Sequence, residues 1–324
     1  MGGGLAGPEL AAAVSNAGGL GVLGMGGLPA QVIREEIRDL RSRTDKPFGV
    51  NLIMPLMGEE PQVEACLEER VPLLILFWGD PTPYVERAHA AGTRIGVQAG
   101  SVEEAKAAAD AGVDFVIIQG VEAGGHVRGT TGLSIVLPAT VDAVRPLPVV
   151  AAGGIADGRG VAAALQLGAQ AVSLGTRFLC SEESRAAHEY KERIVRAKAE
   201  DTYHTKLFDL EWPDAAHRVL RNRTVDAWEA AGSPVTGQRP GEGEVVGSMP
   251  VAGQTYELKR YGVFMPMRGF QGDLEEQVLY CGQSCSLVND IKPAAEIVAD
   301  LVRGAEAQLR GSQGDVERSA SVLT

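Results

Sequence analysis

Short apolar runs alternate with longer amphipathic segments through the first half of the chain, with a period of roughly 25 residues. The apolar runs are rich in leucine and β-branched residues and are apolar on both faces, which is typical of parallel strands covered by helices. They predict strands at residues 19–23, 48–53, 73–78, 93–98, 114–119, 148–152 and 171–175. The amphipathic segments predict helices at residues 8–16, 30–43, 61–70, 84–91, 102–111, 137–144 and 160–167.

Repeated strand–helix units of this kind form either a closed barrel or a doubly wound sheet. The candidate functional residues lie at the ends of many different predicted strands. They are Asn51, Gln98, Gln119, Gly153 and Gly175. A doubly wound sheet would gather such residues at one switch point, whereas a barrel spreads them around its C-terminal mouth. We therefore expect an α/β fold of the (β/α)8 TIM-barrel type.

The start of the chain does not complete such a barrel. The predicted strands number about seven, and a (β/α)8 barrel needs eight. The chain opens with Met1-Gly2-Gly3-Gly4, which is typical of a strand-to-helix loop with no strand before it. Our hypothesis is that the first strand is missing because the chain was defined from an internal methionine. Mass spectrometry of the native N-terminus tests this, and a native start at Met1 would refute it.

The second half of the chain departs from the strand–helix pattern. Its segments predict a charged amphipathic helix, a Gly- and Pro-rich connector and a closing helix, at residues 181–199, 232–253 and 292–308. We expect three parts: a barrel, a helical cap against its mouth and a disordered tail, formed by residues 1–180 with 288–310, 181–287 and 311–324. The cap segments that we expect to shape the substrate side are residues 206–223 and 256–270.

Composition narrows the class of protein. The chain has 324 residues and a formal net charge of -12, and such an acidic surface argues against nucleic acid or anionic membranes as partners. No apolar run reaches about 18 residues and no signal-peptide pattern is present, so we expect a cytoplasmic protein without a membrane span. The four cysteines show no CxxC pattern and no histidine at metal spacing, which predicts reduced thiols and no metal site. The sequence leaves a homo-oligomer open.

The run QGVEAGGH, from Gln119 to His126, follows a strongly β-prone segment. Gly124 and Gly125 carry no Cβ, so a flat ligand can lie against the backbone there. His126 could be a satisfied structural histidine, but its place after a strand end and two glycines favours proton transfer. We interpret Glu122 as a structural partner for a backbone N–H or an arginine. The remaining histidines are assigned to the surface or the core, and the methionines and tryptophans to the core.

Two further strand ends carry glycines next to polar groups. Gly153 and Gly154 follow one predicted strand and precede a helix, and Gly175 with Thr176 follow the next strand. Backbone N–H groups at such turns can hold a phosphate, and the last two strands of a (β/α)8 barrel commonly form this site. Taken alone, each glycine pair could serve only to form a tight turn. The two turns in this order favour phosphate binding.

Amide side chains close three of the predicted strands, at Asn51, Gln98 and Gln119. Taken singly, each is best explained as a loop amide bonded to its own backbone. Together they favour hydrogen bonds to a heteroaromatic ring, because an amide both donates and accepts, which suits an isoalloxazine.

These stretches resemble the nitronate monooxygenase family, formerly called 2-nitropropane dioxygenases, which are FMN-dependent (β/α)8-barrel enzymes. The resemblance covers nearly the whole chain to about Gly304, and the run at residues 119–126 is its most specific part. The matching stretches are residues 1–4 with 15–21, 119–126, 151–155, 175–178 and 280–284.

The resemblance implies that FMN lies across the C-terminal mouth of the barrel. His126 matches the family's catalytic histidine, and in protonated form it would also stabilise an anionic substrate. The implied substrates are alkyl nitronates, with neutral nitroalkanes as a further candidate, oxidised by O2 to a carbonyl compound and nitrite. The implied cofactor contacts are Met1 and Gly2 at the ring with Asn51, Gln98 and Gln119 nearby, Gly153, Gly154, Gly175 and Thr176 at the phosphate, and Gly125 near the cofactor.

Three alternatives stay open. Enoyl-acyl-carrier-protein reductase II, also an FMN barrel, resembles this chain in the Gly-Gly-His segment but typically carries an acidic residue where Gln119 stands. An NADH:quinone reductase is a second possibility, and both would use NAD(P)H as electron donor. A barrel that binds a phosphorylated metabolite without redox chemistry is the third.

Overall fold

Seven parallel strands form one curled sheet in a computed structural model that describes residues 2–57, 61–251 and 254–322. The strands pair in the order in which they follow along the chain: β1 (Gly21–Gly24), β2 (Phe48–Ile53), β3 (Leu73–Phe77), β4 (Arg94–Ala99), β5 (Phe115–Gln119), β7 (Val149–Ala152) and β8 (Ala171–Ser173). The helices that alternate with them are α1 (Pro8–Asn16), α2 (Ala30–Arg43), α3 (Gln62–Glu68), α4 (Thr82–Ala90), α5 (Val102–Asp110), α6 (Leu133–Val144), α7 (Gly158–Gln166) and α8 (Thr176–Leu179).

The fold is the expected α/β TIM-barrel type, with seven strands in the described residues. Within that part of the chain, β1 pairs only with β2 and β8 only with β7. The loop before α1 runs along the end of β1, where the Gly4 N–H donates to the Gly24 carbonyl at 2.8 Å. The core lies between the outer face of the sheet and its helices, with Leu23, Leu52 and Leu74 fully buried.

Predicted and observed elements coincide closely, and the start of α6 is an instructive exception. The predicted helix begins at residue 137, just before Pro138. The observed α6 begins one turn earlier, at Leu133. Both carboxylate oxygens of Glu122 accept from the Leu133 N–H, at 3.0 and 3.1 Å, so a distant side chain satisfies the helix start. This also confirms the interpretation of Glu122 as a partner for a backbone N–H.

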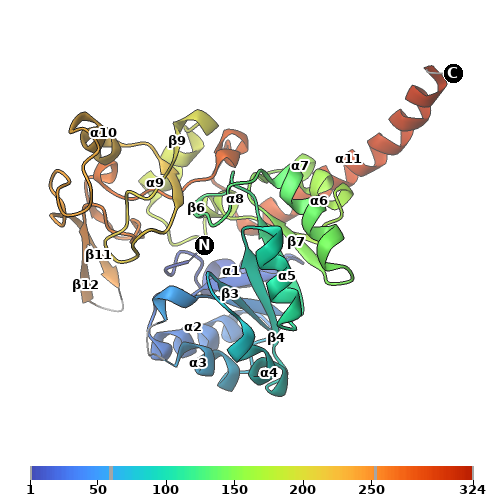
Figure 1. Cartoon of the computed structure of the whole chain (residues 1–324), viewed down its shortest axis with the longest axis horizontal. Coiled ribbons are helices and arrows are strands. Elements are labelled where there is room, and N and C mark those ends of the chain that lie inside the picture. The colour runs from blue at the N-terminus through green and yellow to red at the C-terminus, as the bar shows by residue number, and fades with distance from the viewer. Residues whose placement is uncertain (1, 58–60, 252–253, 323–324) are drawn as a thin grey trace.

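The cap, residues 181–287, is mixed α/β and not helical as expected (Figure 1). Its described residues include the α-helices α9 (His188–Val195) and α10 (Arg223–Ala230), several short 3-10 helices, and strands that belong to two small antiparallel sheets. The first sheet joins β6 (Gly125–His126), β10 (His217–Leu220) and β9 (Thr202–Thr205), and the second joins β12 (Gln254–Lys259), β11 (Val245–Val251) and β13 (Gln271–Gly272). These strands follow no strand–helix period, and β10 pairs with β6 across a long sequence separation, which hides them from a periodicity analysis.

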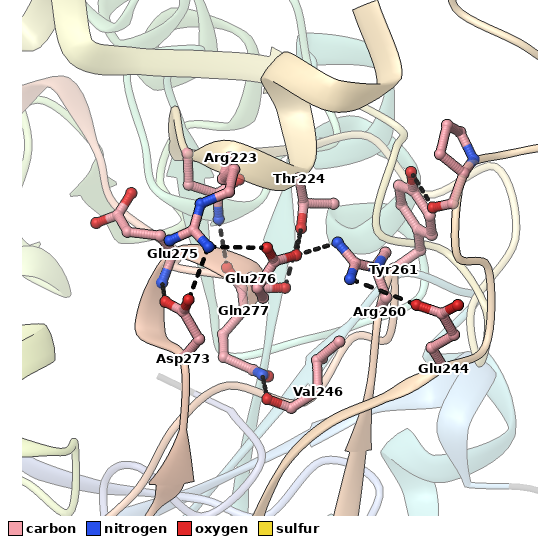
Figure 2. A network of polar contacts seen from close by, with 12 residues as sticks. Arg223, Thr224, Glu244, Val246, Arg260, Tyr261, Asp273, Glu275, Glu276 and Gln277 are labelled. Carbon is pink, nitrogen blue, oxygen red and sulfur yellow. Dashed lines mark hydrogen bonds and ion pairs between the residues drawn. The ribbon is translucent and has the colours of Figure 1, made fainter. Parts of the chain in front are cut away.

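Charged side chains hold the outer half of the cap together (Figure 2). The Glu276 carboxylate accepts from Arg223 at 3.3 Å and from the Thr224 hydroxyl at 3.2 Å, and it also pairs with Arg260. These contacts join the start of α10 to the short helix η3 (Leu274–Glu276) and to the end of the β11–β12 hairpin. Beneath these charged groups the cap is held by an apolar cluster that includes Tyr190 and Tyr261.

The last helix, α11 (Ala294–Val322), extends beyond the rest of the chain at its C-terminal end (Figure 1). Residues 311–322 are helical where we expected a disordered tail, and residues 323–324 lie outside the described residues. Gly311 and Gly314 lower the helix propensity by about 1 kcal/mol each relative to alanine, which weakens the helix without breaking it. An i,i+4 ion pair between Glu306 and Arg310 supports this turn.

Candidate active site

One cavity at the carboxyl ends of the strands brings the candidate site residues together. Because parallel strands end at the same side of the sheet, residues far apart in sequence meet there. Of the candidates proposed from the sequence, the cavity lining includes Gly2, Asn51, Gln98, Gln119, Gly125, His126, Gly153, Gly154, Gly175 and Thr176. Met1, the remaining candidate, lies outside the described residues. The cap closes the cavity with side chains from both segments expected to shape the substrate side.

The two glycine turns after β7 and β8 present unpaired donors. Gly153 and Gly154 have φ values of 93° and 71°, a conformation that favours glycine. Within the described chain, no protein acceptor takes the backbone N–H groups of Gly153, Gly154 or Gly175. The Thr176 hydroxyl accepts from the Gly282 N–H at 3.0 Å and keeps its own proton to donate. This set of donors fits a phosphate group without any cationic side chain.

Gly124 and Gly125 have different roles. A Cβ on Gly124 would lie 2.3 Å from the Gly282 nitrogen and 2.5 Å from the Cys281 carbonyl carbon, so the cap backbone already fills this space. A Cβ on Gly125 would meet no atom within 4 Å, and its φ of 75° is again left-handed. Only Gly125 therefore leaves room for a ligand, whereas the sequence suggested that both glycines would.

The three amide side chains also differ. The Gln119 Nε2 donates to the His126 carbonyl at 3.0 Å, and its Oε1 accepts from the Arg128 N–H at 3.3 Å. This amide holds the segment that carries the histidine. The Asn51 Nδ2 donates to the Ile75 carbonyl at 3.3 Å. The Gln98 amide has no hydrogen bond to another described residue, so it is the one best placed to serve a ligand.

His126 lies in a box of aromatic rings. Its imidazole stacks on Trp212, with ring centroids 4.0 Å apart and planes inclined by 24°. Tyr280 and His217 each lie 5.4 Å from it, and Trp78 lies 6.3 Å away at 90°. The Nε2 of His126 is buried and has no hydrogen-bond partner in the part of the chain that the structure describes.

Burial in this box, and in second place the neighbouring His217, lower the pKa of His126 well below its usual value. The imidazole is therefore neutral at pH 7, whereas the role considered for an anionic substrate needs its protonated form. His217 is neutral as well, because its Nδ1 bonds the Ala215 carbonyl at 2.8 Å and its Nε2 accepts from the Phe208 N–H at 3.2 Å. Burial lowers the pKa of His217 to about 4. A neutral imidazole with a free nitrogen can take a proton from a substrate.

Several lining residues were missed by the sequence analysis. Trp212 and Phe77 lie in the cavity lining, although the tryptophans were assigned to the core. Trp212 comes from a loop before β10, where no periodicity or motif marks it. Tyr280 lies in the stretch at residues 280–284 that resembles the family, and that likeness was the one signal that could have found it.

Metal and membrane features are absent from the described residues. Within residues 2–57, 61–251 and 254–322, no group of three or more His, Cys, Asp or Glu side chains could hold a metal ion. No helix in that same part of the chain has the length and apolar character needed to cross a membrane.

Known proteins resemble this chain along nearly its whole length. The nitronate monooxygenase (NMO) family pattern matches residues 1–66 and 57–304. The chain is 35% identical to a nitronate monooxygenase of Pseudomonas aeruginosa over 354 residues, covering 95% of this chain and 94% of that protein. The chain is thus a flavin oxidoreductase, and it belongs to the nitronate monooxygenase family.

Two further proteins are similar to this chain and carry other names. A protein of Rhodococcus jostii named (3aS,4S,5R,7aS)-5-hydroxy-7a-methyl-1-oxo-octahydro-1H-indene-4-carboxyl-CoA dehydrogenase is 36% identical over 229 residues, or 71% of this chain. That match spans 63% of the relative's length, which is less than two thirds. Among solved structures, FabK from Thermotoga maritima has a TM-score of 0.78 and 33% identity, covering 97% of this chain and 94% of FabK.

Proposed function

We propose that this protein binds FMN and oxidises alkyl nitronates, and in addition neutral nitroalkanes, with O2 to a carbonyl compound and nitrite. The observation that carries the proposal is the neutral His126, whose Nε2 has no partner among the described residues, in the same cavity as the unpaired glycine donors. The likeness to the Pseudomonas aeruginosa nitronate monooxygenase supports the reaction type.

The chain offers separate groups to the two ends of the cofactor. The N–H groups of Gly153, Gly154 and Gly175 would hold the phosphate, with the hydroxyl of Thr176 beside them. Gln98 would serve the ring edge, and the open face at Gly125 would let the ring approach the backbone. When bound, the flavin would accept electrons from the substrate and pass them to O2.

His126 would have a different task for each substrate. With a neutral nitroalkane, its Nε2 would accept the proton on the carbon next to the nitro group. A nitronate has already lost that proton, so the neutral imidazole would act only as a hydrogen-bond donor to a nitro oxygen in the tautomer protonated at Nε2. Trp212 and Tyr280 would exclude water from this exchange, because both rings are buried and pack on the imidazole.

A second function is an FMN-dependent NAD(P)H reductase, of the enoyl-acyl-carrier-protein reductase II or NADH:quinone reductase type. The likeness to FabK and to the Rhodococcus jostii CoA-ester dehydrogenase favours it, and an apolar cavity would suit an acyl chain. The Gln119 amide is already hydrogen-bonded to the backbone of His126 and Arg128. It therefore adds no support for the reductase function.

Anaerobic mixing of the FMN-loaded protein separates these functions. Bleaching of the flavin band at about 450 nm by propane 2-nitronate, with little bleaching by NADH or NADPH, is the result that we expect. Rapid reduction by a nicotinamide and none by the nitronate would establish the reductase instead. A protein that takes up no FMN would overturn both and leave the barrel without redox chemistry.

A further inference from the structure

The cavity lining contains no formally charged side chain among the described residues. No Lys, Arg, Asp or Glu contributes to it, and its one titratable imidazole, His126, is neutral. The unpaired backbone donors lie at the glycine turns that the phosphate would occupy. A second anionic group on a substrate would therefore enter the cavity without a cation to pair with, which disfavours its burial.

The substrate side is instead apolar. Ile53 from the end of β2, Phe77 from the end of β3, and Trp212 and Val263 from the cap form one packed cluster, which we name the apolar wall. All four residues are buried and line the cavity. Because Trp212 stacks directly on His126, the apolar wall adjoins the imidazole that would act on the substrate.

The charges behind the apolar wall do not favour an anion either. Glu211, next to Trp212 in sequence, accepts from the Val263 N–H at 2.8 Å. Burial raises the pKa of the cavity residue Tyr280, and the Glu211 carboxylate raises it further. The negative charge of Glu211 therefore acts on a side chain of the cavity lining. The Arg128 guanidinium lies 5.0 Å from the Trp78 ring, does not line the cavity and is paired with Glu104.

We propose that the substrate has an uncharged, apolar body attached to its nitronate or nitroalkane carbon, and that the site disfavours substrates with a second anionic group. This inference rests on the proposed function and narrows its substrate class. A straight-chain alkyl or an aryl group would pack on Phe77 and Trp212, whereas a carboxylate there would lose its hydration and face Glu211.

The test compares two nitronates of similar length on the FMN-loaded protein, butane 1-nitronate and propionate 3-nitronate. We expect kcat/KM to be about 100-fold higher for butane 1-nitronate, because only propionate 3-nitronate must bury a carboxylate. An equal or higher value for propionate 3-nitronate would overturn the inference and leave the proposed function intact. Failure of both nitronates to reduce the flavin would overturn the proposed function itself.

Binding without turnover gives a second reading. Nitrobenzene and 4-nitrobenzoate differ by one carboxylate, and neither has a proton on the carbon next to the nitro group. We expect nitrobenzene to perturb the flavin spectrum and to bind at least about 10-fold more tightly than 4-nitrobenzoate. Tighter binding of 4-nitrobenzoate would show a cation within reach and contradict the inference.

Leu56 offers a matched pair of variants, because it lines the cavity, is half-buried and packs against the cluster that forms the apolar wall. Leu56→Lys should bring an ammonium to the apolar wall and raise the relative kcat/KM for propionate 3-nitronate about 10-fold, whereas Leu56→Met should leave the preference unchanged. Glu211→Gln, which changes no residue of the cavity lining, should raise the relative kcat/KM for propionate 3-nitronate about two- to threefold. If neither charge change alters the ratio, the placement of substrate against the apolar wall is wrong.

Discussion

The indole of Trp212 stacks on the imidazole of His126, so the cap and the barrel meet at the candidate catalytic group. A second link lies in the backbone, where β10 pairs with β6 and places His217 opposite His126. The position of the imidazole thus depends on the cap as much as on the barrel strand before it. Mutations in the cap should therefore change the rate of the chemical step as well as the substrate preference.

Replacing His126 by asparagine should separate the two substrate types. The His126→Asn variant should lose about 10²–10⁴-fold in kcat/KM with a neutral nitroalkane, because the base that takes the proton is gone. The loss with a nitronate should be much smaller, since no proton transfer is needed. His89→Asn is the matched control, because His89 is exposed, lies away from the cavity lining and pairs with Asp114. Equal losses with the two substrates would contradict the role as a base.

Trp212 should control the protonation of His126. In the native protein, activity with a nitroalkane should stay constant as the pH falls through 6.5, because the pKa of the buried His126 lies well below that value. Trp212→Ala admits water, so the pKa should rise toward 6.5 and the acid limb of the kcat/KM profile should move up with it. Trp212→Phe keeps a ring against the imidazole and should preserve most of the native profile. An unmoved limb in Trp212→Ala would show that the indole does not protect the imidazole.

The buried histidine pair should make the protein sensitive to acid. The pKa of His217 is about 4 in the folded protein and near its usual 6.5 when unfolded. The unfolded state therefore binds more protons below pH 6.5, and stability falls as the pH drops from there toward 4. His217 alone should lower the free energy of unfolding by about 2 kcal/mol between pH 8 and pH 5. Urea titrations at the two pH values measure this, and the difference should shrink in His217→Gln.

The sequence predicted the barrel well because its strands and helices are local. The buried strand at residues 48–53 and the helices at 8–16 and 30–43 have the predicted bounds, since each is marked by its own apolar period and end signals. The cap was mispredicted because its strands have no regular period, and because β10 pairs on one side with β6, which lies far earlier in the sequence.

The candidate site could be predicted in position but only partly in chemistry. Strand ends located the cavity, because parallel strands must open at one side. The assignment of Gln119 to a ligand could not anticipate that the His126 carbonyl would occupy its amide. The neutral state of His126 was equally hidden, since it arises from rings such as Trp212 that the chain brings from afar.

The two adjacent glycines of the Gly-Gly-His run give a last prediction. A Cβ at position 124 would collide with the backbone of Cys281 and Gly282, so Gly124→Ala should lower the free energy of unfolding by about 1–3 kcal/mol and loosen the cap. A Cβ at position 125 has open space but a left-handed backbone, so Gly125→Ala should cost about 1–2 kcal/mol through strain.

The two variants should differ in their response to the cofactor. Because the added methyl group of Gly125→Ala points into free space beside the expected ring, we predict at least about 10-fold weaker FMN binding with little change in cap packing. Gly124→Ala should instead make the cap easier to digest by a protease, with a smaller effect on FMN affinity at permissive temperature. Flavin fluorescence titration and limited proteolysis on both variants measure the two effects. If Gly125→Ala binds FMN with native affinity, the ring does not lie against this glycine, and the proposed cofactor placement fails there.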